Sequence, residues 1–128
     1  MAFTGIFILP LPVDDQDRAL GFYRDRIGME VALDADLDDD WRMIMMKLPD
    51  TQTKIQFARR QEVRYSEEVP ALYLECADVD AETERLKGEE VRFLMNPTEL
   101  PWIDTERFAM FLDSEGNTVV IHATPPEG

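Results

Sequence analysis

The sequence predicts an α+β fold built from two βαβββ modules, and two observations support this prediction. Each half contains an aspartate that can cap a helix and a glycine that can end it: Asp15 and Gly28 in the first half, Asp78 and Gly88 in the second. A strand-like apolar segment precedes each helix, and three more follow it. Two copies of one supersecondary unit within 128 residues indicate an internal repeat.

Short apolar runs supply the strands of the first half. The first run covers residues 3–11 and is short enough for a buried strand. Tyr23 lies on the apolar side of the helix that follows and is expected to pack that helix onto the sheet. The acidic segment at residues 34–40 is expected to be an exposed loop. Three further strands are predicted at residues 29–33, 41–48 and 53–58.

The second half repeats this order after a polar linker at residues 59–70. A proline-containing loop is expected at residues 96–106, and residues 113–117 have the composition of a turn. The predicted strands lie at residues 71–77, 91–95, 107–112 and 118–123.

The charge balance excludes some classes of partner. The chain has 27 acidic and 13 basic side chains and a formal net charge of −14. Nucleic-acid-binding domains carry basic patches, and anionic membranes attract basic segments, so neither partner is expected. With 45% hydrophobic residues the chain can form a core of its own.

The cysteine count and the first residues bear on the compartment. Cys76 is the single cysteine, so no intrachain disulfide can form, which fits a reducing cytoplasm. The apolar N-terminal run lacks the basic segment that opens a signal peptide, and no apolar run approaches transmembrane length. A cytoplasmic protein is therefore expected.

Four sequence stretches together carry a resemblance to a known family: VDDQDRALGFYRDRIGMEV, YLECADVDAETERL, PTELPW and FAMFLDSEGNTVVIH. The sequence resembles the vicinal oxygen chelate superfamily, also called the glyoxalase/bleomycin resistance protein/dioxygenase family, over nearly its whole length. The resemblance implies one domain over residues 1–128, with half-modules at about 1–60 and 69–128. It also implies a curved mixed sheet around a cavity, and a homodimer.

The resemblance also identifies where a metal would be bound. Metal enzymes of the family place one ligand on the first and last strand of each half, and counting from the motifs puts these positions at Ile8, Gln56, Ala71 and Val120. Three of these residues have no side-chain donor, and the amide of Gln56 is a poor ligand for a transition metal. A two-histidine iron site is also excluded by number, because His122 is the single histidine. No metal or other cofactor is expected, although a magnesium or calcium site made of carboxylates stays open.

The acidic segment at residues 34–40 begins like a calcium-binding loop. It has Asp39 where such a loop needs its glycine, and Met45 where it needs its final glutamate. A solvated charged loop is the preferred interpretation.

Strand alternation predicts which side chains line the cavity. Trp102 is added from the PTELPW loop. The candidate ligand-binding residues are Ile8, Gln56, Ala71, Tyr73, Glu75, Trp102, Val120 and His122. The opposite set is more apolar and is expected to pack under the helices: Phe7, Leu9, Ile55, Phe57, Leu72, Leu74, Cys76, Val119 and Ile121.

The sequence leaves the function between three hypotheses. The first is a small organic ligand bound without a transition metal, as in bleomycin-resistance-like proteins. The second is a lyase, isomerase or dioxygenase-type enzyme with an atypical site, in which His122 and Glu75 serve as acid–base groups; alternatively, Glu75 simply pairs with Lys54. The third is a protein-interaction module that retains an unused cavity.

Overall fold

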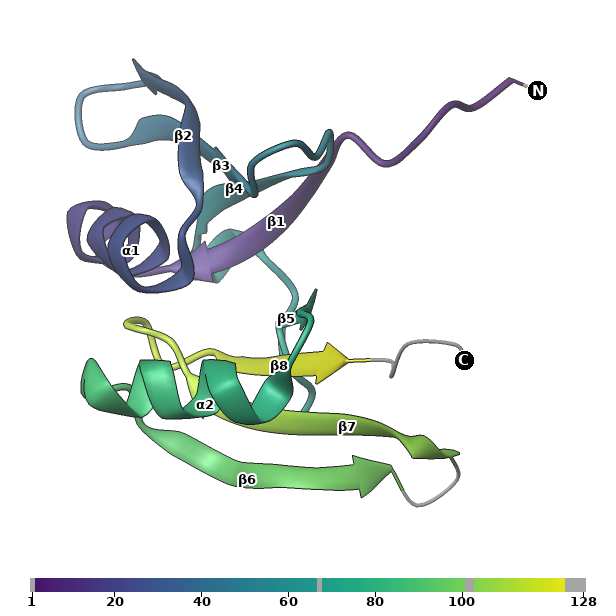
Figure 1. The fold of residues 1–128 in the computed structure, drawn as a ribbon. Coiled ribbons are helices and arrows are strands. Elements are labelled where there is room, and N and C mark those ends of the chain that lie inside the picture. The colour runs from purple at the N-terminus through teal and green to yellow at the C-terminus, as the bar shows by residue number, and fades with distance from the viewer. Residues whose placement is uncertain (1, 67, 101–102, 124–128) are drawn as a thin grey trace. The chain divides into compact units, whose positions relative to one another are not determined.

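The computed structural model describes residues 2–66, 68–100 and 103–123; of residues 100 and 103–105 it describes the backbone. The chain folds into two compact units, Met1–Tyr65 and Ser66–Gly128. Each unit is a four-stranded mixed sheet with one main helix (Figure 1).

The first unit has the strand order β1-β4-β3-β2. Strand β1 runs parallel to β4, and the other neighbours are antiparallel. Its helix α1 continues into a π-helical turn at Tyr23–Ile27, and a short 3-10 helix at Arg60–Glu62 follows the last strand. The main elements are β1 (Ile8–Val13), α1 (Gln16–Phe22), β2 (Glu30–Asp36), β3 (Arg42–Lys47) and β4 (Lys54–Arg59).

The second unit repeats the pattern with the strand order β5-β8-β7-β6. Strand β5 is parallel to β8, and the remaining pairs are antiparallel. The predicted α+β class with paired βαβββ modules is therefore confirmed. The elements are β5 (Leu72–Glu75), α2 (Val79–Gly88), β6 (Phe93–Leu100), β7 (Ile103–Leu112) and β8 (Thr118–Ala123).

The core of each unit lies between its helix and one face of its sheet. In the first unit, Tyr23 and Phe57 are both fully buried, with ring centroids 6.1 Å apart, so Tyr23 packs the helix onto β4 as predicted. In the second unit, Leu86 of α2 and Phe111 of β7 are buried, and Phe111 lies 5.5 Å from the ring of Phe93. Each such side chain contributes about 1.5–3 kcal/mol by leaving water.

Local polar contacts fix the ends of the helices. The Asp15 carboxylate accepts a hydrogen bond from Arg18 N, and the Asp78 carboxylate accepts one from Ala81 N, both at 3.0 Å. Both predicted N-caps are therefore confirmed. Gly28 closes the first helical segment at φ 91°, as the sequence indicated.

The second helix ends differently from the first. Gly88 is its last residue, as predicted, but the left-handed conformation follows two residues later at Glu90, with φ 66°. The backbone reverses there because Val91 N donates a hydrogen bond to Leu86 O at 3.0 Å.

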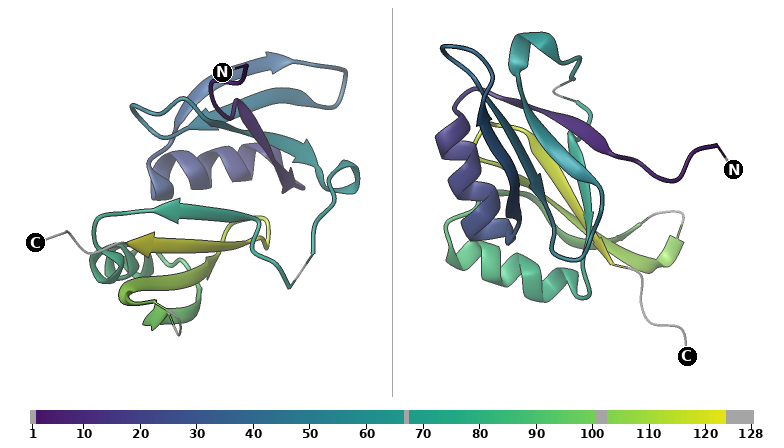
Figure 2. Two further views of the ribbon diagram at one scale, coloured as in Figure 1. Left: turned by 90° about the vertical axis from the view of Figure 1, so that its right-hand side faces the viewer. Right: turned by 90° about the horizontal axis from the view of Figure 1, so that it is seen from above.

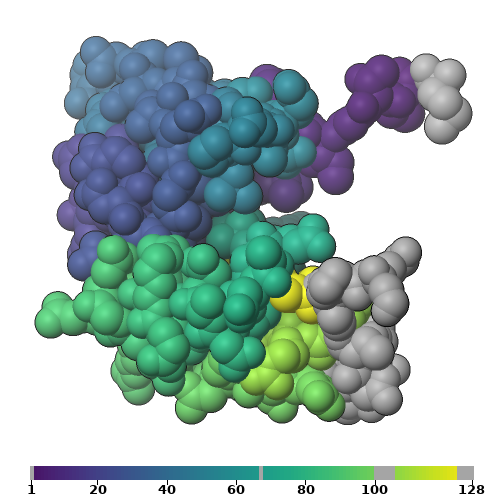
Figure 3. Space-filling model, viewed as in Figure 1, coloured from purple at the N-terminus to yellow at the C-terminus, as the bar shows by residue number. Residues whose placement is uncertain are grey.

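The predicted start of the first strand is wrong. Strand β1 begins at Ile8, and the first pair in its register is Ile8 with Lys54. Residues 2–7 lie before this first pair and outside the strand, although Phe7 O still accepts a hydrogen bond from Lys54 N at 2.9 Å. Phe3 and Phe7 are 89% and 66% exposed, and Leu9 is 45% exposed rather than packed under the helix. Figure 3 shows this segment, in purple, projecting from the first unit.

The loop predicted at residues 96–106 is also wrong, because β6 and β7 extend through most of it. The register of this pair shifts between Met95 and Thr98, where three steps along β6 oppose two along β7. Pro97, which has no N–H for the ladder, falls in this irregular stretch, where a strand tolerates proline. In the first unit, residues 34–36 likewise belong to β2 and not to a loop.

Both helices are short. Within the described ranges, no helix is long and apolar enough to cross a membrane.

Two glycines of the first helical segment make a matched test of the backbone argument. A Cβ added at Gly21 or at Gly28 would meet no atom within 4 Å, so packing does not distinguish them. Gly28→Ala should cost about 1–2 kcal/mol because of its left-handed backbone, whereas Gly21→Ala, inside α1, should stabilise by up to about 1 kcal/mol. Urea denaturation measures both changes, and equal stability of the two variants would contradict this account.

Candidate functional site

Within the second unit, α2 covers one face of the sheet, and the described residues of that unit place no helix on the other face (Figures 1 and 2). On β8, Val119 and Ile121 are 0% and 4% exposed on the covered side. Because side chains alternate along a strand, Val120 and His122 point to the other side. We call that side the helix-free face. It carries Tyr73, Glu75, Glu106, Phe108, Met110, Val120 and His122.

Strand register arranges these residues in two rows across the sheet. Val120 lies opposite Tyr73 of β5 on one side and opposite Met110 of β7 on the other. Directly opposed residues share a face of the sheet, so these side chains are neighbours. Tyr73 is 65% exposed, while Val120 is only 6% exposed, so this row offers an accessible aromatic ring beside an apolar centre.

The second row carries the polar chemistry. His122 lies opposite Glu75 of β5 and opposite Phe108 of β7. Its Nε2 lies 2.6 Å from Oε2 of Glu106, a diagonal neighbour on β7. The two side chains are 29% and 21% exposed, so water reaches the pair only in part.

The partner of His122 differs from the one that the sequence suggested. Glu75 shares its row, but the hydrogen bond goes to Glu106. Glu106 was missed because residues 96–106 were expected to form a loop. The signal was present, since Glu106 precedes Phe108 by two residues and so takes the same face of β7. Lys54, suggested as a partner for Glu75, donates to the carbonyl of Gln52 at 3.3 Å.

The other candidate residues are distributed between the two units. Ile8 and Gln56 are half-buried on β1 and β4, but Gln56 lies opposite Pro10 and not opposite Ile8. Ala71 is exposed, immediately before β5. Trp102 lies outside the described residues.

A metal site needs several ligand side chains that converge on one point. In residues 2–66, 68–100 and 103–123, no three His, Cys, Asp or Glu side chains gather so that they could hold a metal ion. Cys76, which was expected to pack under the helix, is half-buried and forms no disulfide, and burial raises the pKa of its thiol.

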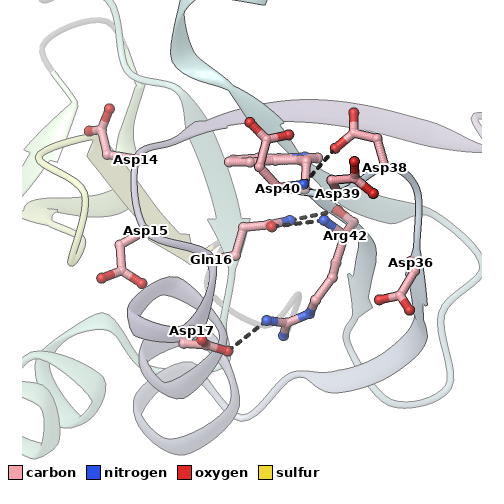
Figure 4. A pocket seen from close by; sticks show the side chains of 10 residues that line it. Asp14, Asp15, Gln16, Asp17, Asp36, Asp38, Asp39, Asp40 and Arg42 are labelled. Carbon is pink, nitrogen blue, oxygen red and sulfur yellow. Dashed lines mark hydrogen bonds and ion pairs between the residues drawn. The ribbon is translucent and has the colours of Figure 1, made fainter.

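A second feature, the acidic hollow, lies in the first unit and has a volume of about 440 Å³ (Figure 4). Gln16 joins its two sides, because its amide donates to Arg42 O at 2.6 Å and accepts from Arg42 N at 3.0 Å. The lining residues are Asp14, Asp15, Gln16, Asp17, Asp36, Asp38, Asp39, Asp40, Trp41 and Arg42.

Arginines of the chain itself neutralise part of this acidity. Arg42 contacts Asp17 at 2.9 Å and Asp34 at 3.0 Å, and hydrogen bonds to these carboxylates, Asp34 first, raise the pKa of its guanidinium. Figure 4 shows the side chain of Arg42 reaching Asp17.

Arg59 neutralises carboxylates of the loop that lines another part of the hollow. It contacts Asp38 and Asp40, each at 2.9 Å, and lies 5.0 Å from the centroid of the Trp41 ring. The hydrogen bond from Arg59 and, to a smaller extent, the hydrogen bonds from Asp40 lower the pKa of Asp38 to about 2. The segment is thus held by ion pairs and is more than the solvated loop that the sequence suggested.

Comparison with known proteins gives one family. The family model of the Glyoxalase/Bleomycin resistance protein/Dioxygenase superfamily matches residues 5–121. The chain is 29% identical to the uncharacterized protein YurT of Bacillus subtilis (strain 168) over 126 residues, which covers 91% of this chain and 96% of the relative.

Solved structures agree with this match. The chain is similar to TnmS3, an antibiotic binding protein from Streptomyces sp. CB03234, with 26% identity, a TM-score of 0.82, and 97% and 98% of the two chains covered. A superfamily member from Sphaerobacter thermophilus DSM 20745 shares the fold at 24% identity and a TM-score of 0.81, with 96% and 99% covered.

The ion pairs of the acidic hollow predict a pH dependence. Because the pKa of Asp38 is lowered from 3.8 to about 2, its contribution to stability is complete above about pH 4 and is lost as the pH falls towards 2. Arg59→Gln should bring the Asp38 pKa back towards 3.8, measured by carbon NMR titration of the carboxyl groups. Arg24→Gln, which breaks an exposed pair with Asp25, should leave Asp38 unchanged. An Asp38 pKa near 3.8 in the unaltered protein would refute the pairing.

Proposed function

Because the chain belongs to the glyoxalase/bleomycin resistance protein/dioxygenase superfamily, we propose that it binds a small organic molecule without a transition metal. The ligand has an apolar body and one or two polar ends. It lies on the helix-free face of the second sheet, with its apolar body over Val120 and Tyr73.

One observation carries this proposal: three of the four positions expected to bind a metal, Ile8, Ala71 and Val120, have apolar side chains. In the second unit these are Ala71, which is exposed, and Val120, which stands between Tyr73 and Met110. Aliphatic groups at these positions remove the coordinating atoms. Val120, 6% exposed, forms an apolar floor, and the exposed Ala71 and Tyr73 beside it supply the surface that an apolar ligand can cover. Each Å² of apolar surface covered is worth about 25 cal/mol.

The similarity to TnmS3, an antibiotic binding protein, supports a binding function. It does not identify the ligand of this chain. We propose the same kind of ligand contact for the corresponding face of the first sheet, where Ile8 and Gln56 are half-buried. Trp102 remains a candidate for the same role on the basis of sequence.

A second candidate function is an enzyme of the isomerase or lyase type. The observation that favours it is the His122–Glu106 pair, whose 2.6 Å separation suits proton transfer. The two functions differ in the fate of the ligand, because a binding protein returns it unchanged. Native mass spectrometry of the protein from its own host, followed by chemical analysis of the released molecule, distinguishes them.

We also propose a cytoplasmic homodimer. The first 13 residues have no charged side chain in a chain of net charge −14, so two copies repel each other least there. Pairing of two copies through the backbone of the β1 edge is disfavoured. Lys54 N donates to Phe7 O at 2.9 Å, so the backbone groups of residues 7, 9 and 11 point towards β4 and those of Pro10 and Pro12 point away from it. Proline has no N–H, so these outward positions cannot donate a hydrogen bond to a second strand. The contact therefore uses the exposed side chains of residues 3–9.

The ligand prediction is tested by a thermal-shift screen of small aromatic compounds. Compounds that stabilise the protein should do so equally with and without EDTA. Tyr73→Ala should weaken the binding of compounds on the second sheet on the order of tenfold, and Gln56→Ala should weaken the binding of compounds on the first sheet by a smaller factor. Tyr65→Ala, which removes another exposed tyrosine of the chain, is the matched control and should have no effect. Binding that disappears with EDTA and returns with a divalent ion would overturn the metal-free proposal.

The dimer prediction is tested by sedimentation velocity at micromolar concentration. The protein should sediment as a dimer, and Phe7→Asp should shift it to the monomer because a charge cannot be buried in the apolar contact. Leu37→Asp places the same charge on an exposed leucine in the acidic loop and should leave the dimer intact. A monomeric unaltered protein contradicts the proposal.

A further inference from the structure

We infer that Glu106 fixes the hydrogen position on the His122 ring, so that the pair recognises a hydroxyl or N–H group of the ligand. The inference rests on the proposed function, because it names the polar end of the ligand bound on the helix-free face. It goes beyond the proposed function because it assigns a positioning role to Glu106, which belongs to none of the sequence motifs.

The atoms of the pair determine which groups remain for a ligand. An ionised carboxylate only accepts hydrogen bonds, so at 2.6 Å the Nε2 of His122 must carry the hydrogen and donate it to Glu106 Oε2. A neutral imidazole has one hydrogen, which leaves Nδ1 as an acceptor. The second carboxylate oxygen of Glu106 is an acceptor as well. The pair therefore offers two acceptors and can satisfy a ligand that brings a donor.

The surroundings favour the same class of ligand. Glu75 lies opposite His122 in the register and adds another acceptor-only group to this row. Phe108, on the other side of His122, gives the row an apolar flank. An anionic ligand would meet two carboxylates in a chain of net charge −14. The ligand class is therefore an uncharged or cationic organic molecule with a hydroxyl or N–H group beside its apolar body.

Partial burial makes this recognition effective. The side chains of His122 and Glu106 are 29% and 21% exposed, so a ligand can remove the remaining water. A polar site that loses water rejects a ligand without the matching group, because its acceptors are then left unpaired. We expect a preference of roughly tenfold for the donor-bearing ligand, which is the usual effect of one such hydrogen bond.

The first experiment reads the hydrogen position directly. Since His122 is the single histidine, tag-free protein labelled with nitrogen-15 histidine gives the signals of one ring. At a pH where the spectrum shows a neutral ring, NMR should place the hydrogen on Nε2. Glu106→Ala should shift the ring towards a mixture of the two forms, whereas Glu106→Gln, whose amide oxygen also accepts, should keep the hydrogen on Nε2. A hydrogen on Nδ1 in the unaltered protein would overturn the inference.

The second experiment uses two probes of nearly equal shape, 2-naphthol and 2-methoxynaphthalene, in calorimetric titrations at a pH where the NMR spectrum shows a neutral His122 ring. The unaltered protein should bind 2-naphthol roughly tenfold more tightly, because the methoxy compound has no donor. Glu106→Ala should remove this preference without changing the affinity for 2-methoxynaphthalene, and Glu106→Gln should restore most of it. Glu84→Ala, at an exposed position of α2, is the matched control and should preserve the preference.

The outcomes distinguish the proposed binding function from the inferred role of Glu106. If both probes bind equally and Glu106→Ala changes neither affinity, the inference is wrong while the proposed binding function stands. If neither probe binds, both are overturned. A preference that survives Glu106→Ala also overturns the inference, because a merely structural glutamate would give that result.

Discussion

One constraint shapes both halves of the molecule: a single short helix covers only one face of a four-stranded sheet. In the second unit, Val119 and Ile121 are buried on the face that α2 covers, and the alternate residues Val120 and His122 are left on the other. The polar groups of the helix-free face can therefore vary without disturbing the core. The proposed site chemistry depends on this separation of packing from binding.

Local chemical signals could be predicted from the sequence, whereas features that depend on strand pairing could not. Asp15 and Gly28 act within one turn of a helix, and both were identified in advance. Phe7 belongs to an apolar run typical of a strand, but it precedes the first pair of β1 with β4 and stays exposed. Glu106 contacts His122 only because β7 pairs with β8, and the residues around it do not by themselves reveal that pairing.

The strong acidity of the chain acts differently in its two units. In the acidic hollow, Arg42 and Arg59 hold several of the facing carboxylates, and the low pKa of Asp38 records that pairing. The residues named on the helix-free face include no lysine or arginine, and Glu75 and Glu106 lie beside His122. Most carboxylates of the hollow are therefore already paired with arginines of the chain, while the helix-free face keeps hydrogen-bond acceptors that a ligand can use.

The most direct test of the central claim is a set of intermolecular nuclear Overhauser effects between 2-methoxynaphthalene and the methyl groups of the protein, recorded in EDTA. If the helix-free face binds an apolar ligand without a metal, the probe should give cross-peaks to the methyl groups of Val120 and Met110. Cross-peaks to methyl groups of the covered core, such as those of Val13, with none to Val120, would contradict the claim. So would binding that appears only after a divalent ion is added.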